Sequence, residues 1–187
     1  MKWIAFNPDW QNSPEPTPSA AATEVSAPPT SAPDVTLKCK VVVAEDDPIS
    51  RAVISSHLRN WGYDLFIARD GREALEALRA ERCPVLAVLD WMMPELDGVE
   101  VCRQVRQMEK MVYVLLLTAR SGKEQLVEAF NAGVDDYLVK PFHKEELRAR
   151  LTAGLRVLTL QHILSQRVNQ LEAALAENQS LRLQIPI

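Results

Sequence analysis

The sequence predicts an α/β fold, a doubly wound sheet of five parallel strands with helices on both of its faces. Five short apolar runs alternate with amphipathic stretches between residues 40 and 150, which is the pattern of repeated strand–helix units. Most of the runs are continuously apolar, as is typical of strands that are buried on both faces. A chain of 187 residues has room for one such domain and for additional segments.

The strands are expected at the apolar runs, and the helices in the intervals between them. The runs are Val41–Val43, Leu65–Ile67, Val85–Leu89, Val112–Leu117 and Tyr137–Val139. Pro48 suits the first turn of the first helix, and Gly62 follows its end. The stripes that we expect to be buried are Ile49, Val53, Ile54, Leu58 and Trp61, then Ala74, Leu75 and Leu78, then Val101, Cys102 and Val105, and last Leu126, Val127 and Phe130 before Gly133.

Residues 1–38 are predicted to form a disordered tail ahead of a domain of residues 39–150. The tail holds seven of the twelve prolines and no glycine, and a segment of Pro, Ala, Ser and Thr cannot bury enough apolar surface to offset its ordering entropy. Trp3, Phe6 and Trp10 lie within eight residues of one another. They are either a short docking motif or an accident of composition, and both interpretations stay open.

Residues 151–187 are predicted to form a helical stalk that extends the last helix of the domain. Leu164, Val168, Leu171, Leu175 and Asn178 are spaced 4-3-4-3, which is typical of a coiled-coil seam with one polar position. We therefore expect a homodimer through this helix. The alternative is a helix that folds back on its own domain.

Composition excludes several classes of function. No apolar run approaches the ~20 residues of a membrane helix, and Pro8 interrupts any signal peptide. Cys39, Cys83 and Cys102 are far apart and lack metal-ligand spacing, so small buried side chains in a cytoplasmic protein are expected. A net charge of −4 offers no basic face for nucleic acid.

Acidic and polar side chains follow four of the five expected strands. Glu45-Asp46-Asp47 follows the first, Asp90 the third, Thr118 the fourth and Lys140-Pro141 the fifth. The carboxyl ends of parallel strands meet at one edge, where ligands of such sheets bind. Crowded carboxylates repel one another unless a positive charge lies among them. Lys140 is one candidate and Mg²⁺ is another, because the expected donors are oxygens only.

Four motifs in this order resemble the receiver domain of two-component response regulators. They are residues 45–51 (EDDPISR), 89–98 (LDWMMPELDG), 117–120 (LTAR) and 135–142 (DDYLVKPF), and the resemblance covers residues 40–151. It implies a flavodoxin-like sheet of strand order 2-1-3-4-5. It also implies a phosphoacceptor signalling protein rather than a conventional enzyme, with a histidine kinase or phosphotransfer protein as its partner.

The resemblance implies a role for each matching residue. Asp90 would accept the phosphoryl group. Mg²⁺ would be bound by Glu45, Asp46 and Asp90 and by the backbone carbonyl of Met92. Thr118 would hydrogen-bond to the phosphoryl group, and the Lys140 ammonium would form an ion pair with it. The peptide bond between Lys140 and Pro141 would be cis, which aims the lysine inward. Tyr137 would be the switch aromatic that carries the change to the surface.

Two rival functions on similar sheets fit the sequence poorly. A Mg²⁺-dependent phosphatase with an aspartyl nucleophile needs a second aspartate two residues later, where this chain has Met92. A flavin binder needs Ser, Thr and Gly in its first loop, where Glu45, Asp46 and Asp47 would repel a phosphate.

The sequence says less about how the chain would pass its signal on than about the site that would receive it. The segment of residues 148–158 is similar to the stalk that joins receivers to diguanylate cyclase domains, but no effector domain is recognised after it. The chain is therefore either a receiver that signals through contacts and pairing, or a fragment or degenerate descendant of a longer regulator.

Overall fold

The computed structural model describes residues 39–82, 84–108, 110–119 and 122–183, and side chains as far as residue 179. The predicted tail with its three aromatic residues, Cys83 and Arg120 lie outside the described residues. Cys39 and Cys102 are buried, as expected.

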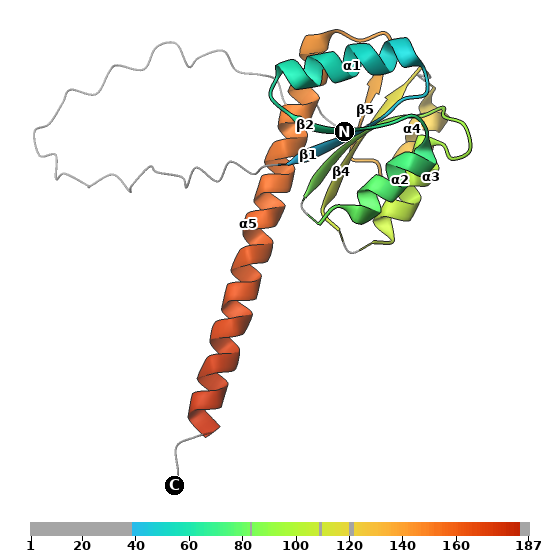
Figure 1. The fold of residues 1–187 in the computed structure, drawn as a ribbon. Coiled ribbons are helices and arrows are strands. Elements are labelled where there is room, and N and C mark those ends of the chain that lie inside the picture. The colour runs from blue at the N-terminus through green and yellow to red at the C-terminus, as the bar shows by residue number, and fades with distance from the viewer. Residues whose placement is uncertain (1–38, 83, 109, 120–121, 184–187) are drawn as a thin grey trace, which may run out of the picture. The chain divides into compact units, whose positions relative to one another are not determined.

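The described residues form one sheet of five parallel strands in the order β2-β1-β3-β4-β5 (Figure 1). The strands are β1 (Lys40–Ala44), β2 (Asp64–Ala68), β3 (Val85–Asp90), β4 (Val112–Thr118) and β5 (Asp136–Val139). Every residue of β3 and β4 is buried, because helices cover both faces of these central strands. The predicted fold class and strand order are confirmed.

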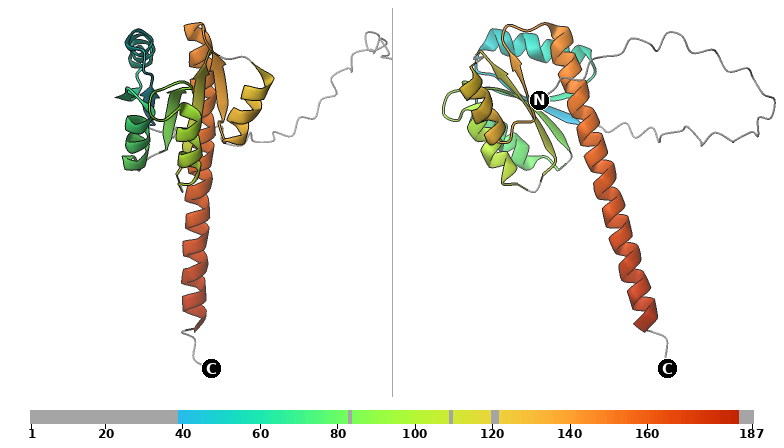
Figure 2. Two further views of the ribbon diagram at one scale, coloured as in Figure 1. Left: turned by 90° about the vertical axis from the view of Figure 1, so that its right-hand side faces the viewer. Right: turned by 180° about the vertical axis from the view of Figure 1, so that it is seen from behind.

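Five helices cover the sheet, two on one face and three on the other (Figure 2). They are α1 (Pro48–Asn60), α2 (Gly71–Ala80), α3 (Gly98–Arg106), α4 (Lys123–Asn131) and α5 (Lys144–Leu183). Leu58 of α1 and Leu151 of α5 belong to one buried cluster with Val41 and Val43 of β1. Buried side chains of α2, α3 and α4 belong to a second cluster with Val42 and Ala44, which point to the opposite face of the same strand.

Aspartates begin three of the helices. The carboxylates of Asp47, Asp70 and Asp97 accept hydrogen bonds from backbone N–H groups three residues later, at 2.7–2.8 Å. Each side chain satisfies a donor that the first turn leaves unpaired and places negative charge at the positive end of the helix dipole. The cap at Asp97 fixes the start of α3 directly after the loop that follows β3.

The expected apolar stripes of α1 and α4 are buried only in part. Ile54 and Leu58 are buried, but Ile49 and Val53 are exposed. On α4, Val127 and Phe130 are also exposed, and Ala129 is its only buried residue among those described. Ile49 and Val53 lie beside Pro141 and Phe142, which follow β5, so this part of the α1 stripe extends past the ends of the strands.

Helix α5 packs on the sheet through its first turns and then leaves it (Figure 1). Leu147, Leu151, Gly154 and Leu158 are buried, whereas Leu164, Leu171 and Leu175 are exposed. A Cβ at Gly154 would lie 2.6 Å from the ring of Tyr113 on β4, so glycine permits this close approach. The helix does not fold back on its own domain, and that alternative is wrong. Within the described residues, no helix has both the length and the apolarity to cross a membrane.

We expect Gly98→Ala to lower the free energy of unfolding by about 3 kcal/mol. A Cβ there would lie 2.2 Å from the backbone oxygen of Asp90, and a backbone atom cannot rotate away as a side chain can. The matched control is Gly62→Ala. Gly62 has φ +85 and nothing within 4 Å of an added Cβ, so about 1 kcal/mol of backbone strain is expected. Urea unfolding compares the two, and equal losses would contradict the close approach.

Candidate functional site

Three carboxylates meet at the carboxyl edge of β1 and β3. Glu45 and Asp46 directly follow β1, and Asp90 is the last residue of β3. The two strands are neighbours, with Ala44 paired to Leu89, so Glu45 lies beside Asp90. One carboxylate oxygen from each residue lies within 4.8 Å of the others. Glu45 and Asp90 are buried and Asp46 is exposed, so the cluster opens to solvent on one side.

Lys140 brings a positive charge into this cluster. Its Nζ lies 2.7 Å from Oε2 of Glu45 and 3.0 Å from Oδ1 of Asp90. Lys140 directly follows β5, which is separated from β3 by β4, so the long side chain reaches across the edge. Its backbone N–H donates to the Thr118 carbonyl at 2.7 Å, and its peptide bond to Pro141 is cis.

The electrostatics of the cluster leave an excess of negative charge. Burial raises the pKa of the Glu45 carboxyl above its ordinary value, and the hydrogen bond from Lys140 offsets only part of that rise. The pKa of Lys140 is also raised: burial alone would lower it, but hydrogen bonds to Glu45 and Asp90 outweigh burial. The cluster therefore holds three carboxylates and one ammonium group, and this excess of negative charge favours the binding of an additional cation.

The other predicted site residues surround this cluster at different distances. Thr118 is the last residue of β4 and is buried. It directly follows Leu117, which is the residue of β4 that pairs with Asp90. Met92 is exposed in a cleft of about 510 Å³ that Asp46 and Asp97 also line. Tyr137 pairs with Leu116, two residues before Thr118 on β4, so it lies further along the sheet from the acids.

Tyr137 instead connects β5 to two helices. Its ring meets Phe130 of α4 edge-on at 5.9 Å between centroids, and the Arg150 guanidinium of α5 lies 5.9 Å from its centroid. Arg150 also donates to Asp136 at 2.6 Å. The tyrosine therefore lies between α4 and α5, on the outer part of the domain.

Sequence reasoning missed two features around the acids. Arg51 donates to the backbone carbonyls of Glu45 and Asp46 at 2.7 and 3.0 Å, which holds the acidic turn against α1. Its position in the first turn of that helix was a signal, since side chains there lie near the preceding turn. The second feature is a groove of about 460 Å³ beside Lys140, with Ile49, Val53 and Phe142 in its lining.

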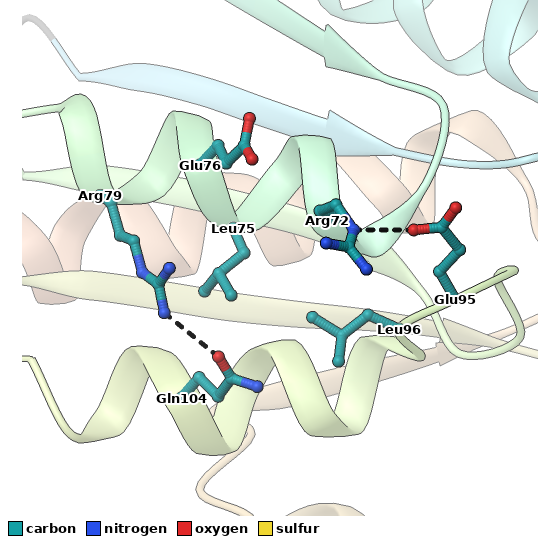
Figure 3. Close-up of a pocket in the computed structure, with 7 residues that line it drawn as sticks. All are labelled: Arg72, Leu75, Glu76, Arg79, Glu95, Leu96 and Gln104. Atoms are coloured by element: carbon teal, nitrogen blue, oxygen red, sulfur yellow. Dashed lines mark hydrogen bonds and ion pairs between the residues drawn. The ribbon is translucent and has the colours of Figure 1, made fainter.

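A smaller pocket of about 250 Å³ lies between α2, α3 and the loop after β3 (Figure 3). Arg72 of α2 lies 2.7 Å from Glu95, and Arg79 donates to Gln104 of α3 at 3.3 Å. Glu95 has a positive φ of 63 and belongs to the loop after β3. The exposed pair with Arg72 ties this loop to α2.

Curated response regulators are similar to this chain over its central part. MprA of Mycolicibacterium vanbaalenii is 46% identical over 120 residues, which are 64% of this chain and 52% of MprA. The alkaline phosphatase synthesis transcriptional regulatory protein PhoP of Bacillus subtilis is 42% identical over 117 residues, which are 63% of this chain and 48% of PhoP. The chain thus spans about half the length of these relatives.

Solved structures show the same domain. The receiver domain of the Francisella response regulator 1452 is 35% identical, with a TM-score of 0.59 over 63% of this chain and 97% of that one. The receiver domain of the Pseudomonas aeruginosa sensor histidine kinase PA1611, with magnesium coordinated in its active site cleft, is 30% identical, with a TM-score of 0.58 over 63% and 97%. A probable response regulator with a GGDEF domain is 27% identical, with a TM-score of 0.61 over 65% and 50%.

The family model of the response regulator receiver domain matches residues 41–152, which run from the second residue of β1 to beyond β5 and include the whole acidic edge. The chain belongs to the response regulator receiver domain family.

Proposed function

We propose that this chain is the receiving partner of a two-component phosphorelay and that Asp90 accepts the phosphoryl group. The observation that carries the proposal is the contact of Lys140 with both Glu45 and Asp90 at the edge of the sheet. A lone buried aspartate would be costly, and this site instead surrounds it with the charges that phosphoryl transfer needs. The donor would be the phosphohistidine of a histidine kinase or phosphotransfer protein.

The proposed step is a displacement at phosphorus. An oxygen of the Asp90 carboxylate attacks the phosphorus, the P–N bond breaks, and the imidazole leaves with the electron pair and takes up a proton. Lys140 and Thr118 stabilise the charge on the phosphoryl oxygens, since the transition state is loose and needs positioning rather than covalent help. Water later attacks the acyl phosphate and restores the carboxylate, which makes the signal reversible. In this proposal the chain catalyses only its own modification.

The residues at the edge fit a magnesium ion. Glu45, Asp46 and Asp90 supply clustered carboxylate oxygens, and we assign the Met92 backbone carbonyl as a further ligand. Hard oxygen donors with an exposed side suit Mg²⁺, which retains several of its waters. When bound, Mg²⁺ neutralises charge on the phosphoryl oxygens during transfer.

Asp46→Asn is expected to weaken Mg²⁺ binding by roughly 10- to 100-fold, because it removes the exposed carboxylate of the cluster. Calorimetry measures the affinity, and the fluorescence of Trp91, which adjoins Asp90 in the chain, is a second readout. Asp47→Asn is the matched control. The Asp47 side chain caps α1 through Ser50, and asparagine caps a helix equally well. Equal affinities for the two variants would contradict the proposed metal ligand.

The proposed output begins at Thr118 and Tyr137. When Thr118 moves toward the phosphoryl group, it vacates space that Tyr137 fills, and the contacts of this ring with Phe130 and Arg150 change with it. The surface of α4, β5 and α5 then has two packings. A shift from 1:99 to 99:1 needs about 5.5 kcal/mol, which a few charge-assisted hydrogen bonds of about 1.5–3 kcal/mol each supply.

The groove beside Lys140 is the surface that we assign to the phosphodonor. Its exposed apolar side chains, Ile49 and Val53, lie next to Pro141 and Phe142, and the groove adjoins the lysine that contacts Asp90. A partner that delivers a phosphohistidine must bind close to this edge, and buried apolar area would hold it there.

The rest of the chain extends the proposal. We assign residues 1–38 to a tail, 39–150 to the receiver and 151–187 to a stalk, and we propose a cytoplasmic homodimer that pairs through the stalk and contacts neither nucleic acid nor membrane. The likeness to a response regulator with a GGDEF domain favours one alternative, in which the receiver is part of, or descends from, a longer regulator of the diguanylate cyclase type.

A further inference from the structure

An unpartnered apolar stripe runs along α5 beyond the point where the helix leaves the sheet. Leu160, Leu164, Leu171 and Leu175 are 67%, 66%, 65% and 63% exposed, and Val157 and Val168 are exposed on the same side. Leucines this exposed and this regularly spaced are typical of a face that another helix covers. The sheet does not cover them, because the buried contacts of α5 end at Leu158.

The stripe and the receiver-facing side of α5 are different faces. At about 100° per residue, the stripe is centred about 110° around the helix from Leu147, Leu151 and Leu158. A second helix can therefore pack on the stripe while α5 stays docked on its own sheet. The stripe has the spacing 3-4-4-3-4, so two fours follow each other at Leu160, Leu164 and Val168. Such a stutter locally unwinds a coiled coil.

The chemistry of the stripe fits a second copy of the same helix. From Leu164 onward the heptad places leucines at d positions 164 and 171, a β-branched residue, Val168, at the first a position and Leu175 at the second. This combination favours two parallel strands. Asn178 occupies the next d position, where its amide finds a partner when it faces the same residue of the other copy.

Flanking charges give the pair a direction. Arg167 is at a g position and Glu172, five residues later, is at an e position, and both are exposed. In a parallel pair in register, each Arg167 faces the Glu172 of the other copy. In an antiparallel pair, g positions face g positions and e positions face e positions. The other g position of this heptad frame, 174, is Ala, and the other e positions, 165 and 179, are Ser and Gln, so neither charge would meet its opposite.

We propose that the stripe from Val157 to Leu175 binds the same stripe of a second copy, parallel and in register, with Arg167 and Glu172 fixing the register. This inference rests on the proposed pairing through the stalk and adds its orientation. Both receivers then lie at the same end of the joint, so a change at either docked α5 acts on one shared coiled coil.

Cysteine cross-linking of the full chain, with Cys83→Ser as background, reads the orientation. Under mild oxidation, two copies of Leu164→Cys are expected to cross-link to each other, and so are two copies of Leu175→Cys. In a mixture of the two variants, no cross-link between position 164 of one copy and position 175 of the other is expected. Ala173→Cys, on the far side of the same helix, is the control and stays uncross-linked. A cross-link found only in the mixture of Leu164→Cys with Leu175→Cys would show an antiparallel pair and overturn the inference while the pairing stands.

Charge exchange tests the register. Arg167→Glu and Glu172→Arg are each expected to raise the dimer dissociation constant about five-fold, because each creates two like-charged contacts per dimer. The double variant is expected to recover the original value. Sedimentation measures all three, and a double variant weaker than either single one would contradict the contact. A monomer at every concentration, with and without a phosphoryl mimic, would overturn the proposed pairing itself.

Discussion

Replacing Asp90 with asparagine is expected to abolish phosphoryl acceptance completely. Asp90 is the last residue of β3, is buried, and its Oδ1 lies 3.0 Å from Nζ of Lys140. An amide has nearly the same shape but its oxygen is a much weaker nucleophile, so the fold should persist while the chemistry stops. Incubation with Mg²⁺ and a small phosphoryl donor, followed by separation of the phosphorylated form on a phosphate-binding gel, measures the loss.

Asp47→Asn supplies the control for this result. Asp47 lies one residue from Asp46, but its side chain caps α1 through Ser50 and is not part of the carboxylate cluster. This variant should accept the phosphoryl group as the original chain does. Residual phosphorylation of Asp90→Asn above the level of an unfolded sample would place the acceptor elsewhere.

Lys140→Met is expected to lower the free energy of unfolding by about 2–3 kcal/mol in the absence of metal. The change leaves the carboxylates of Glu45 and Asp90, both buried, without the ammonium that contacts them at 2.7 and 3.0 Å. Removal of one partner from a fully buried pair costs about 3–5 kcal/mol, and we reduce this value because the lysine side chain is 23% exposed. Urea unfolding in a chelator gives the value.

Addition of Mg²⁺ should restore part of that stability, because the ion brings positive charge to the same carboxylates. Lys144→Met is the matched control: Lys144 pairs at 3.8 Å with Glu145, and both side chains are mostly exposed, so its unfolding midpoint should not move. If Lys140→Met unfolded at the same urea concentration as the unaltered chain, the account of charge balance at this edge would be wrong.

The sheet was predictable because its strands are buried on both faces. Continuous apolar runs such as Val85–Leu89 leave little ambiguity between strand and surface helix. Once the strands are parallel, their carboxyl ends share an edge. Glu45 and Asp90, 45 positions apart in the chain, lie close together because β1 and β3 are also neighbours in the sheet, an order that the family resemblance implied. The structure places them within reach of one ammonium group.

Amphipathic spacing could not separate a core face from an interaction face. Ile49 and Val53 have the same periodicity as Leu58, yet only Leu58 is buried, because the extent of the sheet beneath α1 is a tertiary property. Phe130 was likewise expected to be buried from its spacing on α4, and it is exposed. The contacts of Arg51 with the acidic turn and of Arg150 with Asp136 depend on how a loop and two elements meet, which residue spacing does not specify.

The most direct test of the central claim is the intact mass of the full chain after incubation with Mg²⁺ and a small phosphoryl donor. We predict a gain of one phosphoryl group that maps to the peptide containing Asp90, is lost on alkaline hydrolysis, and does not form when a chelator replaces Mg²⁺. A mass that stays unchanged under these conditions, or a phosphoryl group found on a residue outside the acidic edge, would contradict the assignment of Asp90 as the acceptor.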